Sequence, residues 1–177
     1  MAFVLLLGGA RSGKSALAQQ VAARTGRPVT VVATAEAGDD EMAARIERHR
    51  EARPAAWATV EEPLDLLGAV AGAPAGVFLL VDCLTLWVAN LLGGGAGAAE
   101  IDSAAAETVR ALQARDSVVV SNEVGLGIVP VNELARRFRD VLGSVNALFA
   151  QAADRAVLMV AGRALDLASI ESVLERR

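Results

Sequence analysis

Short, almost uninterrupted runs of apolar residues recur along the 177-residue chain. Such runs are typical of strands that are covered on both faces in a parallel sheet, because neither face of the strand meets water. The runs predict strands at Phe3–Leu7, Val29–Ala33, Val77–Val81, Ser117–Ser121 and Ala156–Ala161.

Segments with helical periodicity lie between these runs. A helix that starts at Lys14 is expected to stop at Gly26, since Pro28 follows just beyond. The helix that starts at Asp39 begins with three acids and ends with arginines, which is the charge distribution that the helix dipole favours. The predicted helices are Lys14–Thr25, Asp39–Arg53, Glu100–Ala114, Asn132–Ala153 and a short terminal Leu167–Arg176. Small-residue loops are expected at Ala69–Gly76 and Gly93–Ala99. The alternation predicts one three-layer α/β domain over residues 1–177, with a mostly parallel sheet and right-handed crossovers.

Composition narrows the function classes. The mean hydropathy of +0.41 comes largely from alanine, and the most apolar window, Gly76–Leu92, contains Asp82 and Asn90, so membrane insertion is not expected. A net charge of −4 argues against general nucleic-acid binding. The single cysteine, Cys83, and the absence of a secretory signal at Met1–Gly9 favour a cytoplasmic protein.

A phosphate-binding loop follows the first predicted strand and opens the first predicted helix. The residues Gly8, Gly9, Ala10, Arg11, Ser12, Gly13, Lys14 and Ser15 fit the pattern G-x-x-x-x-G-K-[ST]. In that context the loop amides point at a phosphate chain, Lys14 reaches the outer phosphates, and the Ser15 hydroxyl binds Mg²⁺. Lys14 is the only lysine among the 17 lysine and arginine residues. The chain thus uses lysine at the one position where a compact ammonium must fit inside a loop, for which arginine is too large and planar. The alternative is a Gly-rich turn without a ligand.

Asp82 ends the third predicted strand, where a second acid of a nucleotide site coordinates the metal directly or through water. The alternative is a helix N-cap or a buried hydrogen-bonding acid, since Thr85, Leu86 and Trp87 follow. Cys83 is interpreted as a small packed side chain and not as a nucleophile.

His49 is the only histidine, and it lies among Arg45, Arg48, Arg50 and Arg53. On the predicted helix Asp39–Arg53, it shares one face with Met42, Ile46 and Arg53. Nearby guanidinium groups repel the charged imidazole and so favour its neutral, nucleophilic form. From the residues alone, a phosphorus-attacking His49 and an inward-facing structural histidine remain equally open.

Asn122 and Glu123 follow the fourth predicted strand, at the carboxyl edge where open α/β sheets place ligands. The glycines at positions 125 and 127 would allow the loop that follows to close over a substrate. These residues are interpreted as organising substrate or metal, with an ordinary polar strand end as the alternative.

Taken together, these motifs resemble the bifunctional adenosylcobinamide kinase/adenosylcobinamide-phosphate guanylyltransferase family of cobalamin biosynthesis. The matching segments are Gly8–Ser15, Ala33–Ala35, Asp39–Ile46, His49–Arg50, Arg53–Pro54, Trp57, Thr59, Glu61, Asp82–Thr85, Asn90–Leu92, Ser121–Pro130, Leu134–Asp140 and Asn146. They run in order over almost the whole chain. The segment Ala161–Leu165 resembles the family only loosely, and Asp166–Arg177 is not covered.

The resemblance implies two reactions on a RecA-like P-loop fold. ATP or GTP first phosphorylates adenosylcobinamide, and GMP is then transferred from GTP to adenosylcobinamide phosphate through a guanylylated histidine, which can only be His49. It also implies a homotrimer. Mg²⁺ at Ser15 and Asp82 is expected from the motifs above, and no nucleic-acid partner is expected from the net charge. The implied nucleotide contacts are Gly8–Ser15, Ala33, Thr34, Ala35, Arg50, Glu51, Ala52, Arg53, Glu61 and Asp82.

Three other classes compete with this interpretation. A regulatory GTPase needs a base-reading Asn-Lys-x-Asp segment, which cannot exist because Lys14 is the only lysine. A simple P-loop kinase for a small metabolite would leave His49 structural and is the main alternative. A nucleotide-binding subunit without enzyme activity would not explain the arginines around His49.

Overall fold

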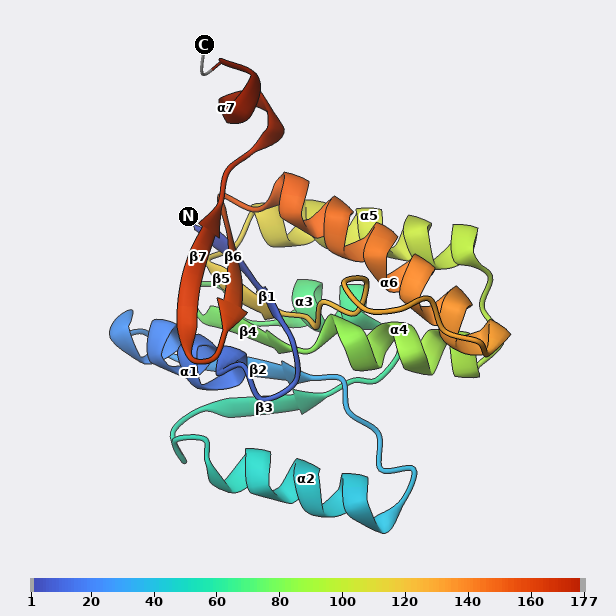
Figure 1. The fold of residues 1–177 in the computed structure, drawn as a ribbon. Helices are drawn as coiled ribbons and strands as arrows, with labels where there is room; N and C mark the ends of the chain where they lie inside the picture. The colour runs from blue at the N-terminus through green and yellow to red at the C-terminus, as the bar shows by residue number, and fades with distance from the viewer. Residues whose placement is uncertain (1, 176–177) are drawn as a thin grey trace.

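A seven-stranded sheet organises residues 2–175, the part of the chain that this computed structural model describes (Figure 1). Its order is β3-β2-β4-β5-β1-β6-β7, and every neighbouring pair is parallel except β6 and β7. The strands are β1 Phe3–Gly8, β2 Val29–Ala33, β3 Ala58–Glu61, β4 Phe78–Asp82, β5 Ser117–Val120, β6 Arg155–Val160 and β7 Arg163–Leu167.

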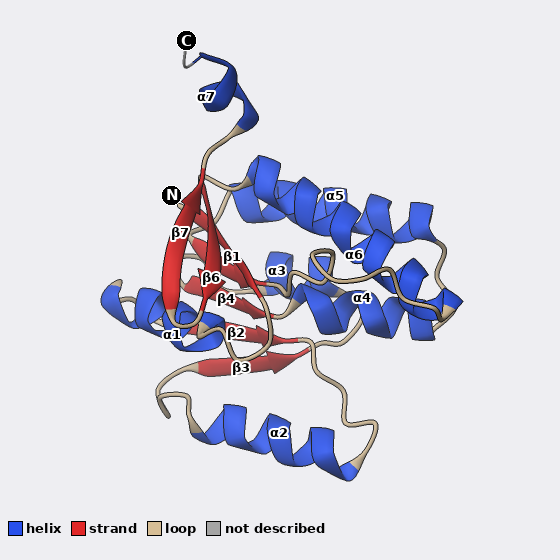
Figure 2. Cartoon of the chain, in the orientation of Figure 1, coloured by secondary structure: helices blue, strands red, loops and turns tan. Residues whose placement is uncertain are grey.

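Helices cover the sheet on both faces, which confirms the predicted three-layer α/β class (Figure 2). The helices are α1 Lys14–Arg24, α2 Asp40–Glu51, α3 Leu66–Gly72, α4 Leu84–Gly93, α5 Ala98–Gln113, α6 Glu133–Ala152 and α7 Ile170–Glu175. The larger core lies between the sheet and α3, α4, α5 and α6, where Trp87 and Phe149 are fully buried. A smaller core lies under α1, which inserts Ala18 and Ala22. Alanine lets this helix approach the sheet closely.

Helix α2 differs from the others because none of its residues is buried. It lies beyond the edge strand β3 (Figure 1). Its start is set by Asp39, whose side chain accepts a hydrogen bond from the Met42 amide at 2.7 Å. The helix that carries His49 is therefore stabilised locally and is not held by core packing.

The five predicted strands are confirmed within one or two residues, but two edge strands were not predicted. All residues of β3 and β7 are exposed, so neither has the continuous apolar run of a central strand. The prediction of a helix from Leu167 is corrected, because Leu167 ends β7 and α7 begins at Ile170. Arg176, its predicted end, lies outside the described residues.

The two predicted loops are shorter than expected. Helix α3 includes Ala69–Gly72, because Asp65 caps it and Leu66 and Val70 anchor it in the core. Helix α4 runs to Gly93, and α5 already begins at Ala98. Within residues 2–175, no helix combines the length and apolar character needed to cross a membrane.

The strand order places four chain segments at one edge of the sheet. Ala33 of β2 pairs with Asp82 of β4, Asp82 pairs with Val120 of β5, and Val120 pairs with Leu6 of β1. Because these strands are parallel, their carboxyl ends all reach the same edge. The phosphate-binding loop, Ala33–Ala35, Asp82 and Asn122 are brought together in this way.

Candidate functional site

The loop from β1 to α1 has the backbone that its sequence pattern predicts. A Cβ atom added at Gly8 would lie 2.3 Å from the Met159 carbonyl oxygen, so no larger residue fits there. Gly13, the residue before α1, has a φ of 98°, a left-handed conformation that glycine adopts without strain. The loop thus wraps tightly and opens at the N-terminus of α1, where backbone amides favour an anion.

Lys14 lies inside this loop with only 7% of its surface exposed. Its ammonium donates to the carbonyl oxygens of Gly8 at 2.8 Å and Gly9 at 2.7 Å, and to the Ser12 hydroxyl at 3.4 Å. Burial lowers the pKa of Lys14, and the Asp82 carboxylate partly opposes that effect. The loop therefore holds a positive charge at its centre. The three oxygen acceptors match the three N–H donors of a compact ammonium, whereas a guanidinium is larger and planar.

Thr34 joins the ends of β2 and β4 behind the site. Its hydroxyl donates to the Cys83 carbonyl oxygen at 2.7 Å and accepts from the Cys83 amide at 2.9 Å, and its own amide donates to the Asp82 carbonyl at 3.1 Å. Thr34 is fully buried, so it fixes the position of Asp82 and does not line the cavity. Its neighbours Ala33 and Ala35 do line the cavity.

Cys83 is unsuited to nucleophilic attack. Burial, with a smaller contribution from the Asp82 carboxylate, raises the pKa of its thiol to about 11. The thiol is therefore protonated near neutral pH, and the thiolate is the reactive form of cysteine. This supports its interpretation as a packed side chain.

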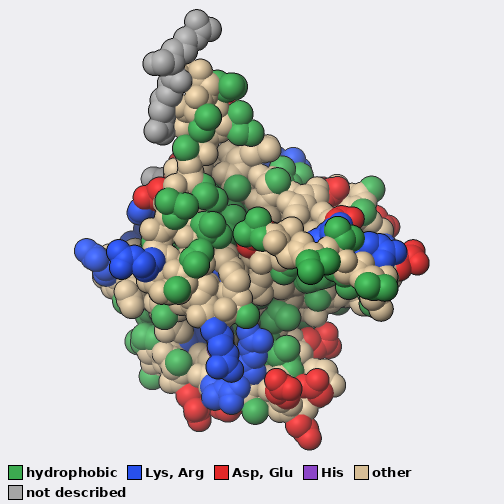
Figure 3. Space-filling model, viewed as in Figure 1, with side chains coloured by type: hydrophobic (Ala, Val, Ile, Leu, Met, Phe, Trp, Pro, Cys, Tyr) green, Lys and Arg blue, Asp and Glu red, His purple; other side chains and the backbone are tan. Residues whose placement is uncertain are grey.

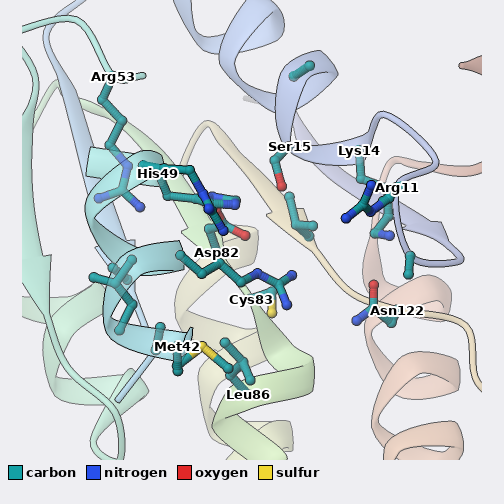
Figure 4. A pocket seen from close by; sticks show the side chains of 18 of the residues that line it. Arg11, Lys14, Ser15, Met42, His49, Arg53, Asp82, Cys83, Leu86 and Asn122 are labelled. Carbon is teal, nitrogen blue, oxygen red and sulfur yellow. The ribbon is translucent and has the colours of Figure 1, made fainter. Parts of the chain in front are cut away.

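His49 faces the same cavity as the loop, from the opposite wall (Figure 4). Its Nδ1 lies 3.6 Å from the Asp82 carboxylate, and about a third of its side chain (36%) is exposed. Met42 and Ile46 line the cavity with it, as the predicted helix face requires. Arg53 also lines the cavity, but it lies beyond the helix, because α2 ends at Glu51 and not at the predicted Arg53. The His49 side chain is partly exposed, whereas the residues of the two hydrophobic cores are buried.

The cavity between α2 and the loop has a volume of about 580 Å³. Basic side chains gather beside α2 on the surface in Figure 3. The cavity is lined by Ala10, Arg11, Ser12, Gly13, Lys14, Ser15, Ala16, Ala33, Ala35, Glu41, Met42, Arg45, Ile46, Arg48, His49, Arg53, Glu61, Asp82, Cys83, Leu86, Val120 and Asn122. The cavity wall carries four arginines and one lysine but only three carboxylates, so its net charge is positive. A positive cavity attracts the negatively charged phosphates of a nucleotide.

Not every predicted contact residue lies in the cavity. Gly8 and Gly9 hold Lys14 through their carbonyl oxygens instead. Glu51 and Ala52 are exposed and lie outside the cavity wall. Arg50 borders a second hollow beside α2 and forms ion pairs with Glu61 and with Glu47. Nucleotide contact by these residues remains a prediction.

Two arginines near His49 differ in environment. The hydrogen bond from Arg50 to Glu61 raises the pKa of Arg50, and it links α2 to the end of β3. Burial lowers the pKa of Arg53, which the Asp82 carboxylate partly offsets. Of these two arginines, Arg53 is thus the partly buried one in the cavity wall, while Arg50 ties its helix to the sheet.

The sequence prediction missed several lining residues. Arg45 and Arg48 were noted as flanking His49, and their helical spacing was the available signal. Leu86 and Glu41 carried no such signal. Asn122 was noted at a strand end but was not assigned to the site, and the structure places it in the cavity wall.

Comparison with known proteins decides the family. Residues 4–167 match the model of a family described as cobinamide kinase / cobinamide phosphate guanyltransferase. The chain belongs to this family. The match ends at residue 167, close to where the sequence resemblance fades.

Members of the cobinamide kinase / guanyltransferase family match almost end to end. The chain is 47% identical over 167 residues to the bifunctional adenosylcobalamin biosynthesis protein CobP of Pseudomonas aeruginosa, covering 92% of this chain and 95% of the relative. It is 43% identical over 175 residues to CobU of Salmonella typhimurium, covering 90% and 96%. Among solved structures, an ATPase from a bacterial type III secretion system aligns with a TM-score of 0.53 and 12% identity, covering 98% of this chain and 60% of the ATPase chain. That likeness supports the predicted P-loop ATPase fold.

Proposed function

We propose that this protein phosphorylates adenosylcobinamide with ATP or GTP, and then transfers GMP from GTP to adenosylcobinamide phosphate through a covalent guanylyl-His49. Membership of the cobinamide kinase / guanyltransferase family supports the pair of reactions. One observation carries the covalent step: His49 projects into the cavity that Lys14 and Ser15 line from the other side.

The kinase step depends on the phosphate-binding loop. When the triphosphate enters, its oxygens replace the Gly8 and Gly9 carbonyls as acceptors for the Lys14 ammonium. The substrate hydroxyl attacks the γ-phosphorus, the bond to the β,γ-bridging oxygen breaks, and the nucleoside diphosphate leaves. Lys14 and the loop amides stabilise the charge that grows on the transferred group and on the leaving diphosphate.

The guanylyl step depends on His49. Its Nδ1 faces Asp82, so Nε2 is the nitrogen that attacks the α-phosphorus of GTP. An N–P bond forms, the bond to the α,β-bridging oxygen breaks, and pyrophosphate leaves. Arg45, Arg48 and Arg53 line the cavity around His49 and offset the negative charge of the phosphates. The phosphate of the corrinoid substrate then attacks the same phosphorus, forming the product diphosphate and freeing the imidazole.

A magnesium ion fits the donors that the cavity offers. The Ser15 hydroxyl and the Asp82 carboxylate both line the cavity and are the oxygen ligands that Mg²⁺ prefers. When bound, Mg²⁺ would neutralise phosphate oxygens. We assign Ser15 and Asp82 to hold it together with those oxygens.

Two finer features rest on the family resemblance. Glu61 lines the cavity at the end of β3 and is assigned to the guanine base, since a carboxylate can accept two hydrogen bonds from a guanine edge. A homotrimer is proposed as the working assembly, and sedimentation of the purified protein tests it: a mass three times 18.2 kDa is expected.

Labelling with α-³²P-GTP and Mg²⁺ tests the covalent step. The wild-type protein should acquire a label that acid removes and alkali does not, as expected for a phosphoramidate, and His49→Ala should acquire none. A wild-type protein that phosphorylates adenosylcobinamide but takes no label would instead be a simple kinase with a structural His49.

A further inference from the structure

Asn122 holds a position in the site that the reactions above do not use. Strand β5 lies between β1, which leads into the phosphate-binding loop, and β4, which ends at Asp82. Val120 pairs with Leu6 on one side and with Asp82 on the other. The chain continues beside β1 past the end of β5, because the Glu123 amide donates to the Gly8 carbonyl at 3.1 Å. Asn122 therefore lies between the loop and Asp82.

The side chain of Asn122 points into the cavity. Successive side chains of a strand alternate between its faces, so Asn122 shares the face of Val120, which packs under α1. Both residues line the cavity, and Figure 4 shows the Asn122 carboxamide on the same side as Lys14 and Arg11. Ser121, between them, faces the other layer and donates to the Asn146 side chain of α6 at 2.6 Å.

Two other elements fix the backbone of Asn122. Its amide donates to the Thr85 hydroxyl of α4 at 2.8 Å, and its carbonyl accepts from the Asn146 side chain at 2.9 Å. Asn146 is 95% buried, with 5% of its surface exposed. By contrast, no described residue forms a hydrogen bond with the Asn122 carboxamide, so its N–H donors are available to a ligand. A rigid backbone with an unused donor group is the arrangement expected of a positioned catalytic amide.

We propose that the Asn122 carboxamide is a further catalytic residue, which donates a hydrogen bond to the terminal phosphate oxygens of the nucleotide between Lys14 and Asp82. Thr85, Ser121 and Asn146 are positioning residues that hold it there. This inference rests on the proposed function. In the guanylyl step the oxygens belong to the departing pyrophosphate, and in the kinase step to the transferred γ-phosphoryl group. The amide adds no charge, so it complements the cation of Lys14 without repelling it.

The test is single-turnover labelling with α-³²P-GTP at saturating concentration, with thermal unfolding of each variant. Asn122→Ala should slow the labelling rate by about 100-fold, which is typical for loss of one donor to a developing oxyanion. Asn122→Asp should slow it further, because a carboxylate repels the phosphates. Both kinase and labelling rates should fall. The Tm of Asn122→Ala should stay within about 2 °C of wild type, since no internal hydrogen bond is lost.

The matched control is Gln20→Ala, which removes an exposed amide of α1 and should label at the wild-type rate. An Asn122→Ala protein that labels within threefold of wild type would overturn the inference. So would a rate loss that follows a large fall in Tm. If the wild-type protein takes no label but phosphorylates adenosylcobinamide, the guanylyl proposal fails, and the kinase rates of the same variants still decide the role of Asn122.

Discussion

Asn146 offers a quantitative test of how the fold supports the site. It is almost fully buried, accepts from the Ser121 hydroxyl at 2.6 Å and donates to the Asn122 carbonyl at 2.9 Å. Asn146→Ala removes the hydrogen-bond acceptor of Ser121 and the hydrogen-bond donor to Asn122 at once. The fully buried Ser121 hydroxyl then has no acceptor, and the Asn122 carbonyl at the cavity wall loses its donor.

The expected cost follows from these two groups. A buried polar group left without a partner costs about 1–3 kcal/mol, and the carbonyl near the cavity belongs at the lower end because water can reach it. The free energy of unfolding should therefore fall by about 2–4 kcal/mol. For a chain of this length that corresponds to a Tm lower by about 5–15 °C. The labelling rate should also fall, because Asn122 loses one of its two backbone anchors.

Urea unfolding of a double-mutant cycle measures this effect. Once Ser121→Ala has removed the hydroxyl, Asn146→Ala should cost about 1–2 kcal/mol less than in the wild-type background. Asn132→Ala is the matched control on the same helix: it removes only an exposed cap bond to the Ala135 amide, costs about 1 kcal/mol, and leaves labelling unchanged. Strict additivity in the cycle, or a cost for Asn146→Ala no larger than that of the control, would refute the reasoning.

The other predictions concern charge and proton binding. Lys14→Met should lower both reaction rates by at least about 100-fold. Lys14→Arg should not restore them, because a larger, planar guanidinium does not reproduce the compact ammonium that the Gly8 and Gly9 carbonyls hold. Steady-state assays check both variants. Alkylation of Cys83 by iodoacetamide should be slow at pH 7.5 and accelerate toward its pKa of about 11. The hydrogen bond from Arg27 lowers the pKa of Asp116, so Asp116 stabilises the fold above about pH 3.9 and loses this effect as pH falls through its folded pKa. Asp116→Asn should therefore lower the Tm at pH 7 but not near pH 2.

The central strands and the phosphate-binding loop were predictable because their signals are local. A strand buried on both faces must be apolar along its length, and the loop needs glycine at Gly8 and Gly13 for steric reasons. The face of α2 that carries His49 followed from helical spacing alone. These features require no knowledge of what packs against them.

Features that depend on distant contacts were not predictable. The hydroxyl of Thr34 is directed toward Cys83 only because β2 pairs with β4, and nucleotide contact by Thr34 stays a prediction from the family resemblance. The edge strands β3 and β7 lack an apolar run because solvent covers them. The sequence indicated that Asn122 lies at the carboxyl edge of the sheet, but the partners that fix its backbone lie 24 and 37 residues away in the chain.

Transfer from isolated labelled protein tests the central claim most directly. Wild-type protein labelled with α-³²P-GTP is freed of nucleotide by gel filtration and then mixed with adenosylcobinamide phosphate or with pyrophosphate. If guanylyl-His49 is the intermediate, the label should move to the corrinoid in the first case and return to GTP in the second, each within the turnover time. A label that stays on the protein while complete reaction mixtures form product would contradict the account.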